Sequence, residues 1–576
     1  MNQKLENILN VSLDATEDEL RKADSLSTGY NWRDNTWEII VKYSGSLESI
    51  RNRYNVYIKE LLNYYAIIVA DKATIELISQ EDVIDYVEKP KSLYYQIERT
   101  KTAACVGSVR ADGNILSGKG VIVGVTDTGI DIFDNAFRNS DGTTRILNIY
   151  DQTTGEKYDK QSIDEYIRLN EDLSGGTFSY DNAPGVDNIM HGTDVSYIAA
   201  GSLGVAYEAD IIAVKMGYSI NNQFPRTTSL MDAIDYIIRK AIEYRKPVAV
   251  NISYGCNYGA HNGNTLLESF IDDISKSYRC VICVGSGNEA DKAIHFGGII
   301  NTGQVQTAYL SVGEYQSAID IQIWKNYWDT IDVMLINPRG EQIGIITEGR
   351  INRYETYNTE IITLLGEPSP YNIYQEIYIN LIPKTDYILS GIWQIVLMAG
   401  SIRAGEYNIW LPSSQALGYA TAFNNPTADG TITIPATARN CIAVGAYNAY
   451  TNSYAAFSGR GFDNSIRNVN AGVKPDITAP GVDISIARQR GNDITYRNVT
   501  GTSYAVPVVT GAAALLMQWG IVMGNDRFMY GEKLKAALID GSKPVGLVGI
   551  TRNDNQPDPR TGWGEVCLKN TLNKIL

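Results

Sequence analysis

The stretch Gly120-Val121-Ile122-Val123-Gly124-Val125-Thr126-Asp127-Thr128-Gly129 decides the fold of this chain. Residues 120–125 form a short, continuous apolar run, which is typical of a strand buried on both faces of a parallel sheet. Asp127 follows this run and precedes a Thr-Gly turn. Because functional groups collect at the carboxyl ends of strands in an open parallel sheet, the sequence predicts a functional aspartate here.

Strand and helix patterns alternate along much of the chain beyond this stretch. Apolar runs at residues 210–215, 247–252 and 440–446 predict further buried strands, and residues 231–244 have the spacing of an amphipathic helix. Regular alternation of this kind is typical of a parallel sheet that carries helices on both faces. We therefore predict a doubly wound α/β domain.

The alternation stops after Gly297 and resumes near residue 418. Segments in between, such as 319–324 and 377–382, alternate apolar and polar residues, and turn residues separate them. A period of two residues is the pattern of half-buried strands. It predicts an antiparallel β-sandwich, of jelly-roll type, inserted at residues 300–417.

A separate α+β unit is predicted at the amino-terminal end. Strand patterns at residues 37–43, 64–70 and 84–88 alternate with helical stretches, one of which begins at Ala73. Strand–helix–strand–helix–strand over so short a length is a small α+β fold.

The composition excludes several classes of partner. A formal charge of −15 argues against binding to nucleic acid or to anionic membrane surfaces, which require clustered Lys and Arg. Residues 1–20 lack the apolar core of a signal peptide, and no apolar run approaches the length of a membrane-spanning helix. We expect a protein made in the cytoplasm without an export signal, with neither a membrane nor nucleic acid as partner.

The six cysteines are too few for a disulfide framework in a chain of 576 residues. Cys280 and Cys283 form a C-x-x-C pair, for which a redox or metal site is the alternative interpretation. They lie in the apolar run 280–285, and no second C-x-x-C or pair of histidines is nearby in the sequence. We predict two packed thiols in a core strand, and no metal or other cofactor.

Two further motifs combine with the Asp127 turn. His191-Gly192-Thr193 precedes a run of small residues, and Gly501-Thr502-Ser503-Tyr504-Ala505-Val506-Pro507 opens an apolar helix. A serine at a helix N-terminus with small neighbours suits a nucleophile, because substrate can approach closely and the helix dipole favours developing negative charge. Each motif taken alone also fits an ordinary turn or helix cap.

The order Asp…His…Ser and the G-T-S-x-A-x-P motif resemble the subtilisin family of serine proteases, the subtilases. The resemblance implies that Ser503 attacks the scissile carbonyl, that His191 takes and returns its proton, and that Asp127 holds the imidazole. It also implies roles for three further segments. These are Asn288 as the oxyanion donor, Ser253, Tyr254 and Gly255 as the edge that pairs with substrate, and Gly285, Ser286 and Gly287 as part of the S1 wall.

One position departs from the family's pattern. Subtilases commonly carry a second histidine three residues after the catalytic one, and here that residue is Asp194. Either the change is tolerated beside the site, or it alters the local electrostatics and holds activity low until a trigger acts. The other two histidines, His261 and His295, lie in Gly- and Asn-rich stretches. We predict loop residues there, with a place along the substrate cleft as the alternative.

The amino-terminal unit resembles the subtilase propeptide, a folding chaperone whose C-terminal tail lies in the active site, and residues 83–88 are similar to its final strand. Counting back from Asp127 by the family's usual spacing predicts autoprocessing after Gln96, with Tyr95 as the neighbouring alternative. The predicted division of the chain is 1–96 for the propeptide, 97–299 for the first part of the protease, 300–417 for the sandwich and 418–576 for the second part of the protease.

Within the subtilases, the architecture resembles the Csp germination proteases of anaerobic spore formers. An unexported chain, a full propeptide, the segment 145–153 and the β-rich insertion between Asn288 and Ser503 carry this resemblance. It implies a monomeric endopeptidase, incorporated into the spore, that keeps its cleaved propeptide bound and activates a spore-cortex hydrolase zymogen by limited proteolysis. Two other functions stay open: general intracellular protein turnover, and a catalytically silent scaffold or sensor.

Overall fold

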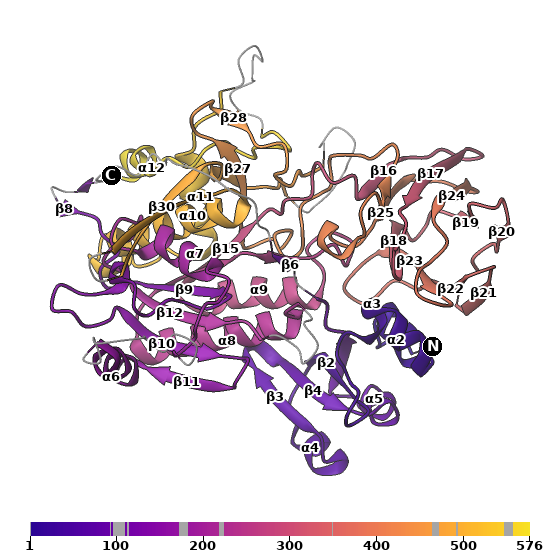
Figure 1. Cartoon of the computed structure of the whole chain (residues 1–576), viewed down its shortest axis with the longest axis horizontal. Coiled ribbons are helices and arrows are strands. Elements are labelled where there is room, and N and C mark those ends of the chain that lie inside the picture. The colour runs from indigo at the N-terminus through magenta and orange to yellow at the C-terminus, as the bar shows by residue number, and fades with distance from the viewer. Residues whose placement is uncertain are drawn as a thin grey trace.

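The computed structural model consists of an N-terminal α+β unit, a central α/β domain and a β-sandwich (Figure 1). The chain forms the N-terminal unit, enters the α/β domain, leaves it for the sandwich and then returns, as the colours from indigo to yellow show. The residues that the structure describes are 2–92, 94–95, 110–111, 114–171, 183–217, 224–347, 349–462, 472–490, 493–546 and 557–576.

A nine-stranded sheet forms the centre of the α/β domain. Its order is β11-β10-β12-β9-β13-β15-β27-β28, with β29 paired to β27, and only β11 and β28 run antiparallel to their neighbours. The predicted strand that ends in Asp127 is β9, and it lies between β12 and β13. The strands are β9 (Ile122–Asp127), β10 (Ile146–Asp151), β11 (Glu156–Asp159), β12 (Asp210–Lys215), β13 (Val248–Ile252), β15 (Cys280–Gly285), β27 (Ile442–Asn448), β28 (Ser453–Tyr454) and β29 (Ile477–Pro480).

Helices cover both faces of the central sheet. Val123 and Val125 of β9 pack in one core with α7 and α10, while Ile122 packs in another with α8 and α9. Because successive side chains of a strand point to opposite faces, this division confirms the doubly wound α/β fold. The helices on or beside the sheet are α6 (Lys160–Glu171), α7 (His191–Ala200), α8 (Thr227–Tyr244), α9 (Leu266–Ser277), α10 (Thr502–Met517), α11 (Gly531–Asp540) and α12 (Leu568–Ile575).

The C-x-x-C pair lies on β15 with its two thiols on opposite faces of the sheet. Cys280 belongs to the core under α8 and α9, and Cys283 to the core under α7 and α10. Both are buried, and burial raises the pKa of each thiol to about 12. Three strand residues span about 10 Å, too far for a disulfide, so these two thiols contribute packing to two separate cores.

Residues 502–522 form the one helical stretch in the described ranges that is long and apolar enough to cross a membrane. Most of it is buried inside the protein, where α10 packs against β13, β15 and β27. A helix that is apolar all round is the expected form of a central core helix.

The N-terminal unit is an antiparallel sheet of order β1-β2-β4-β3, with β5 paired to β2. The strands β2, β4 and β5 coincide with the predicted segments 37–43, 64–70 and 84–88, whereas β1 and β3 were not predicted. A short hairpin of β7 (Arg110–Ala111) and β8 (Asn114–Ile115) follows later in the sequence. The elements of the unit are α1 (Asn7–Asp14), α2 (Glu17–Lys22), α3 (Asp24–Ser27), β1 (Tyr30–Asn31), β2 (Thr36–Tyr43), α4 (Glu48–Tyr54), β3 (Tyr57–Leu61), β4 (Tyr65–Ala70), α5 (Lys72–Ile78) and β5 (Ile84–Glu88).

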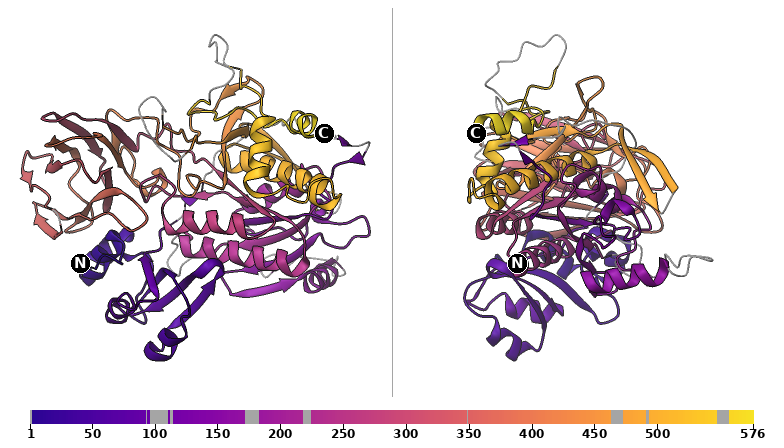
Figure 2. Two further views of the ribbon diagram at one scale, coloured as in Figure 1. Left: turned by 180° about the vertical axis from the view of Figure 1, so that it is seen from behind. Right: turned by 90° about the vertical axis from the view of Figure 1, so that its left-hand side faces the viewer.

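This sheet contributes to two hydrophobic cores. Ile40 faces α8 and α9, where the ring of Tyr65 meets Phe270 edge-on with centroids 5.3 Å apart. Ile39 and Val41 face the opposite core, which they share with α1 and with two strands of the sandwich, β22 and β23. Figure 2 shows the indigo unit beside both other parts. The N-terminal unit is therefore packed against the α/β domain and the sandwich at once.

The sandwich consists of two antiparallel sheets of order β16-β25-β18-β23-β22-β21 and β20-β19-β24-β17-β26, which enclose one core. Its strands extend on both sides of the predicted range 300–417, because β16 begins at His295 and β26 ends at Phe423. The strands are β16 (His295–Ile299), β17 (Val305–Val312), β18 (Ile319–Asn326), β19 (Ile331–Ile336), β20 (Gln342–Ile343), β21 (Ile351–Glu355), β22 (Thr359–Leu365), β23 (Tyr374–Pro383), β24 (Gly391–Ala399), β25 (Glu406–Trp410) and β26 (Ala422–Phe423).

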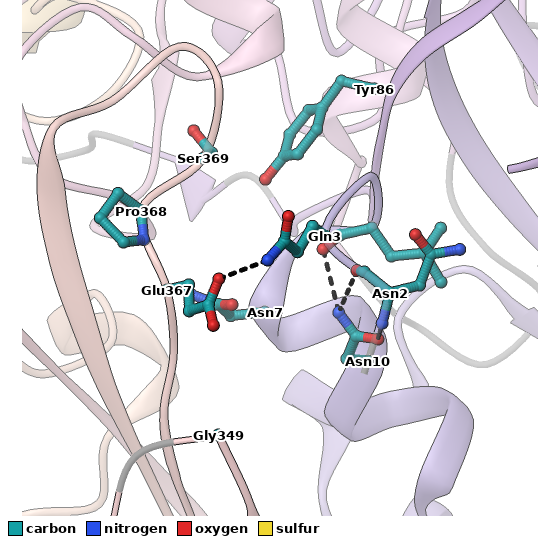
Figure 3. A pocket seen from close by; sticks show the side chains of 10 residues that line it. Asn2, Gln3, Asn7, Asn10, Tyr86, Gly349, Glu367, Pro368 and Ser369 are labelled. Carbon is teal, nitrogen blue, oxygen red and sulfur yellow. Dashed lines mark hydrogen bonds between the residues drawn. The ribbon is translucent and has the colours of Figure 1, made fainter. Parts of the chain in front are cut away.

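A buried ionic cluster lies where the three parts meet. The Lys91 ammonium contacts Glu88 and lies 2.7 Å from Glu6 Oε1. Glu88 Oε2 in turn accepts a hydrogen bond of 2.8 Å from the N–H of Leu266, the first residue of α9. Beside this cluster, a pocket of about 170 Å³ opens between the first residues of the chain and the loop after β22 (Figure 3). Both ion pairs are internal to the N-terminal unit, and the hydrogen bond between Glu88 and Leu266 links this cluster to the α/β domain.

Candidate active site

Asp127 and His191 form a buried hydrogen-bonded pair at the carboxyl end of β9. His191 is the first residue of α7, and its Nδ1 donates to Asp127 Oδ1 at 2.7 Å. Each side chain is only 1% exposed. Burial alone would lower the pKa of the imidazole, but the nearby carboxylates, Asp127 foremost and then Asp194 and Asp187, together raise it. This geometry leaves Nε2 as the basic nitrogen.

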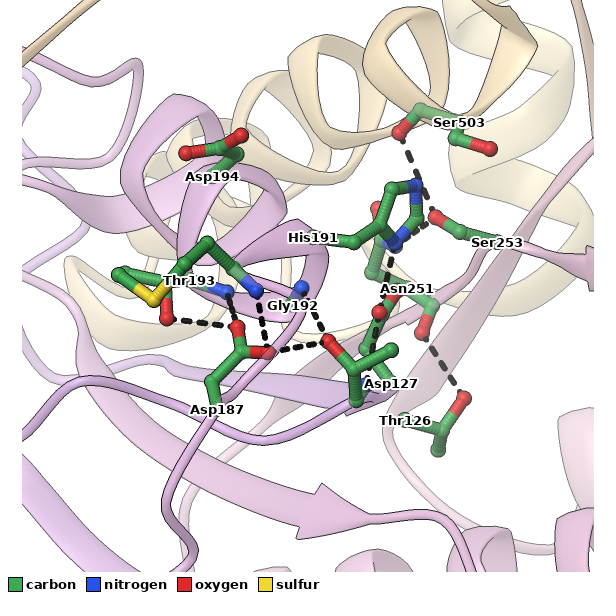
Figure 4. A network of polar contacts seen from close by, with 12 residues as sticks. Thr126, Asp127, Asp187, His191, Gly192, Thr193, Asp194, Asn251, Ser253 and Ser503 are labelled. Carbon is green, nitrogen blue, oxygen red and sulfur yellow. Dashed lines mark hydrogen bonds and ion pairs between the residues drawn. The ribbon is translucent and has the colours of Figure 1, made fainter. Parts of the chain in front are cut away.

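A second buried carboxylate, Asp187, hydrogen-bonds the residues next to this pair in the sequence (Figure 4). Its Oδ1 accepts from Thr128 Oγ1 and from the N–H of Met190, both at 2.7 Å, and its Oδ2 accepts from the N–H and hydroxyl of Thr193 at 2.8 and 2.7 Å. Thr128 Oγ1 also accepts from the N–H of Gly192 at 2.9 Å. The turn after Asp127 and the first turn of α7 are thus joined through one side chain.

Gly192 allows these two segments to approach so closely. A Cβ at this position would lie 2.3 Å from the carbonyl oxygen of Gly129 and 2.9 Å from the Cβ of Asp127. Both distances are too short for any side chain, so the glycine of the His191 motif is required by packing against the Asp127 turn.

Ser503 is the second residue of α10, and its carbonyl is held by an unusual donor. Pro507 has no N–H to donate to that carbonyl, which lies four residues earlier in the helix. Ser253 Oγ donates to it instead at 3.3 Å, and Asn251 Nδ2 donates to Ser253 Oγ at 2.9 Å. In Figure 4, Ser503 lies on the side of the His191 ring opposite Asp127. The proline of the motif therefore couples the start of α10 to the segment after β13.

Asn288 is oriented by the residue before Ser503. Its Oδ1 accepts hydrogen bonds from the N–H and the hydroxyl of Thr502, at 3.0 and 3.1 Å. Its Nδ2 is buried and has no hydrogen-bond partner among the described residues. A buried N–H group without an acceptor is costly and persists where a ligand supplies one. The Asn288 Nδ2 group can therefore donate a hydrogen bond to an oxyanion that forms beside Ser503.

Tyr254 and Gly255 form β14, and this short strand is already paired. β14 runs antiparallel to β6 (Tyr94–Tyr95), with Tyr254 opposite Tyr95 and Gly255 opposite Tyr94. Just before β6, the N–H of Thr227 donates to the carbonyl of Lys91 at 2.6 Å. The chain that leaves the N-terminal unit thus runs along the edge predicted to bind substrate, and Gln96, the predicted processing site, lies outside the described residues.

The predicted S1 segment follows directly on β15. Gly285 is the last residue of that strand, and the N–H of Ser286 donates to the carbonyl of Val444 at 2.9 Å. Gly287 has φ 97°, and a Cβ there would lie 2.5 Å from Thr433. These contacts place residues 285–287 beside Asn288, and their part in binding substrate stays a prediction.

Asp194, the departure from the family's pattern, is fully buried on α7 and forms ion pairs with Arg488 and Arg497. Burial raises the pKa of its carboxyl, and the two guanidinium groups oppose that rise. The residue is thus neither exposed nor unpaired within the helix that carries His191.

The prediction that His261 and His295 lie in loops is wrong for His295, the first residue of β16. Both are buried and stack on Trp410, with ring centroids 4.1 and 4.9 Å from that of the indole. Nδ1 and Nε2 of His261 face the carbonyl oxygens of Ile432 and Asn257 at 2.6 and 3.2 Å. These rings connect the sandwich to the α/β domain. Gly297 and Gly298 break the alternating pattern of β16, which is why the sequence did not reveal the strand.

Asp187, Arg488 and Arg497 were missed by the motif analysis. Asp187 lies four residues before His191, and the two arginines lie in a polar stretch before Ser503. No motif includes them, because each acts through a contact with a segment distant in the sequence.

Models of two known protein families match this chain, one over the N-terminal unit and the other over most of the remaining sequence. A model of the Csp protease B prodomain matches residues 3–91, and a model of the subtilase family matches residues 118–368 and 404–564. The structure is similar to that of the CspB protease of Clostridium perfringens, with 34% sequence identity and a TM-score of 0.72, over 80% of this chain and 94% of that one.

Curated relatives match over shorter stretches. The subtilase-type proteinase RRT12 of Saccharomyces cerevisiae is 33% identical over 128 residues, which are 22% of this chain and 23% of that protein. Subtilisin-like protease 10 of Arthroderma otae is 34% identical over 120 residues, which are 21% and 27% of the two chains. The chain thus spans about a quarter of the length of these curated relatives. Because the subtilase model covers well over half of the sequence, this protein belongs to the subtilase family of serine proteases, and its N-terminal unit is a Csp protease B prodomain.

Proposed function

We propose that this protein is a serine endopeptidase that cuts its own chain after Gln96 and then performs limited proteolysis. The observation that carries the proposal is the pairing of β6 with β14. Tyr95, the last residue of β6, lies opposite Tyr254, and the neighbouring Ser253 contacts the carbonyl of Ser503. In the sequence, Gln96 is the residue that follows β6, and β6 pairs with the strand next to Ser253, which contacts Ser503.

The chemistry follows from these positions. Ser503 Oγ attacks the carbonyl carbon of Gln96 while His191 Nε2 takes the hydroxyl proton, and Asp127 stabilises the resulting imidazolium. Asn288 Nδ2 and the N-terminal end of α10 stabilise the oxyanion. His191 then gives the proton to the amine of residue 97, which leaves, and a water molecule hydrolyses the acyl-enzyme ester with His191 again as base.

Limited cleavage fits this arrangement better than general protein turnover. The prodomain shares one hydrophobic core with α8 and α9 and another with the sandwich. Because its release would expose both cores to water, we expect it to stay bound after processing. A bound prodomain restricts access along β14. Together with the likeness to the CspB protease of Clostridium perfringens, this supports limited proteolysis of a protein substrate. The proposal extends to a monomer of the spore that activates a spore-cortex hydrolase zymogen during germination.

Ser503→Ala tests the chemistry. Wild type is expected to separate into a prodomain and a protease that co-elute on size exclusion and react with a fluorophosphonate, whereas the variant stays full length and unlabelled. Processing of Ser503→Ala would contradict the proposed nucleophile, and an uncut, unreactive wild type would favour a silent scaffold.

Purified cortex-hydrolase zymogen tests the substrate. One shortened product at a single site is expected from processed wild type. Degradation of the zymogen and of casein to many fragments would instead indicate general turnover.

A further inference from the structure

A hairpin immediately before Ser503 presents three arginines on one face. β30 (Ile484–Arg490) pairs antiparallel with β31 (Asp493–Val499), with Arg488 opposite Thr495 and Arg490 opposite Asp493. Arg497 lies two residues beyond Thr495, so it shares the face of Arg488 and Arg490. Like charges this close on one sheet face are destabilising unless acidic groups lie between them.

Asp194 supplies that acidic group from α7, one turn after His191. Arg488 Nε donates to Asp194 Oδ1 at 3.1 Å, and Arg497 pairs with Oδ2. The Asp194 carboxylate is fully buried, and the Arg488 side chain is only 12% exposed. A buried carboxylate between two guanidinium groups holds both, because removing one partner leaves an uncompensated charge.

The Arg488 guanidinium also contacts the residue before His191. Its Nη2 donates to the carbonyl of Met190 at 2.9 Å, so one planar group contacts both Met190 and Asp194. Met190 is in the left-handed conformation, φ 68°, at the sharp turn into α7. Arg488 therefore brackets His191 from both sides along the chain.

The other two arginines attach the hairpin to the rest of the site. Arg490 Nε donates to Asp131 Oδ2 at 2.7 Å, and the N–H of Asp131 donates to Thr193 Oγ1 at 3.0 Å. Arg497 also hydrogen-bonds the side chain of Tyr504, whose ring lies 5.3 Å from the imidazole of His191. The hairpin is thus tied to the Asp127 turn, to the His191 helix and to the residue after Ser503.

We propose that Arg488 is a positioning residue for His191. By contacting Met190 and Asp194 together, it fixes the first turn of α7 and so holds the imidazole between Asp127 and Ser503. In this chain, the position where subtilases commonly have a histidine holds an aspartate that pairs with two guanidinium groups of the hairpin. The inference rests on the proposed function, since it assigns His191 as the base.

Arg488→Lys separates geometry from charge. Lysine keeps the positive charge, but its single ammonium cannot match the planar, two-sided contact of a guanidinium. The variant is expected to process its prodomain, and to cleave a peptide substrate, with kcat lowered about 10- to 100-fold and KM within about twofold. Arg488→Lys at wild-type kcat would overturn the proposal.

The pH dependence of kcat/KM distinguishes a change in the pKa of His191 from a loss of its positioning. The charged or titratable groups around the His191 ring are Asp127, Asp187, Asp194, Tyr504, Arg488 and Arg497. Asp194→Asn removes a charge that raises the pKa of His191, so we expect the acid limb to move to lower pH. Because the same change also breaks the ion pairs with Arg488 and Arg497, we expect the plateau to fall as well. Arg488→Lys is expected to keep the wild-type acid limb at a lower plateau. A shifted limb with an unchanged plateau would mean that charge, not position, is what Arg488 supplies.

Two controls separate the possible failures. Tyr496→Ser, at an exposed position on β31 outside the arginine face, is expected to keep wild-type kcat and melting temperature, which excludes a general effect of altering the hairpin. Ser503→Ala identifies the source of a negative result. If it stays inert while Arg488→Lys matches wild type, only the positioning role fails, and if it remains active, the proposed function itself fails.

Discussion

At the residue scale, Glu376 is a carboxyl group buried where the sandwich meets the prodomain. Burial, and then the nearby Glu6, raise its pKa to about 8, and Gln322 Nε2 donates to its Oε1 at 2.7 Å. In the unfolded chain the same group titrates near 4.5. Between these values the unfolded state releases a proton that the folded state keeps, so this group's contribution to stability falls as pH rises from about 4.5 to about 8.

Glu376→Gln removes that dependence while keeping the acceptor for Gln322. We expect its melting temperature to exceed that of wild type by a few degrees at pH 8, and the difference to shrink toward pH 5. Thermal unfolding at the two pH values measures this. A difference that is constant with pH would show that Glu376 is ionised in the folded protein.

At the scale of one element, the first turn of α10 depends on a side chain from another segment. Ser253→Ala removes the donor to the Ser503 carbonyl, and we expect a loss of about 1–3 kcal/mol in unfolding free energy. Pro507→Ala restores an N–H that can donate to the same carbonyl, so the double variant should recover part of that loss. Denaturant unfolding in the Ser503→Ala background, where processing cannot interfere, measures both. Additive losses in the double variant would contradict this explanation of the motif.

Elements whose pattern is local could be predicted from the sequence. The apolar run of β9 and the small-residue start of α10 each carry their signal within a few adjacent residues, and the order of the three motifs identified the family. β16 could not be found, because its two glycines erase the alternation. Asp187 and Arg488 could not be found either, since their contacts join segments that only the folded chain brings together.

At the scale of the whole molecule, the sandwich holds the prodomain through charged contacts as well as a shared core. Arg353 of β21 donates from Nε to Glu19 Oε1 and from Nη1 to Asp14 Oδ2, both at 2.9 Å. These pairs join the sandwich to the last residue of α1 and to the first turn of α2.

Arg353→Ala is expected to let the processed prodomain dissociate about tenfold faster, because a charge-assisted contact across the two parts is lost. Size exclusion or surface plasmon resonance of the processed protein measures the release. Lys384→Ala is the matched control, since Lys384 pairs with Glu355 inside the sandwich and should leave release unchanged. Equal release from both variants would mean that the Arg353 pairs do not retain the prodomain.

The order of the parts along the chain has a consequence for synthesis on the ribosome. The prodomain emerges first, the sandwich strands between His295 and Phe423 follow, and the arginine hairpin and Ser503 come near the end. Because domains generally fold in the order in which they are made, both surfaces that hold the prodomain exist before the nucleophile has been translated. A chain that is still being synthesised therefore contains its complete prodomain before it contains Ser503.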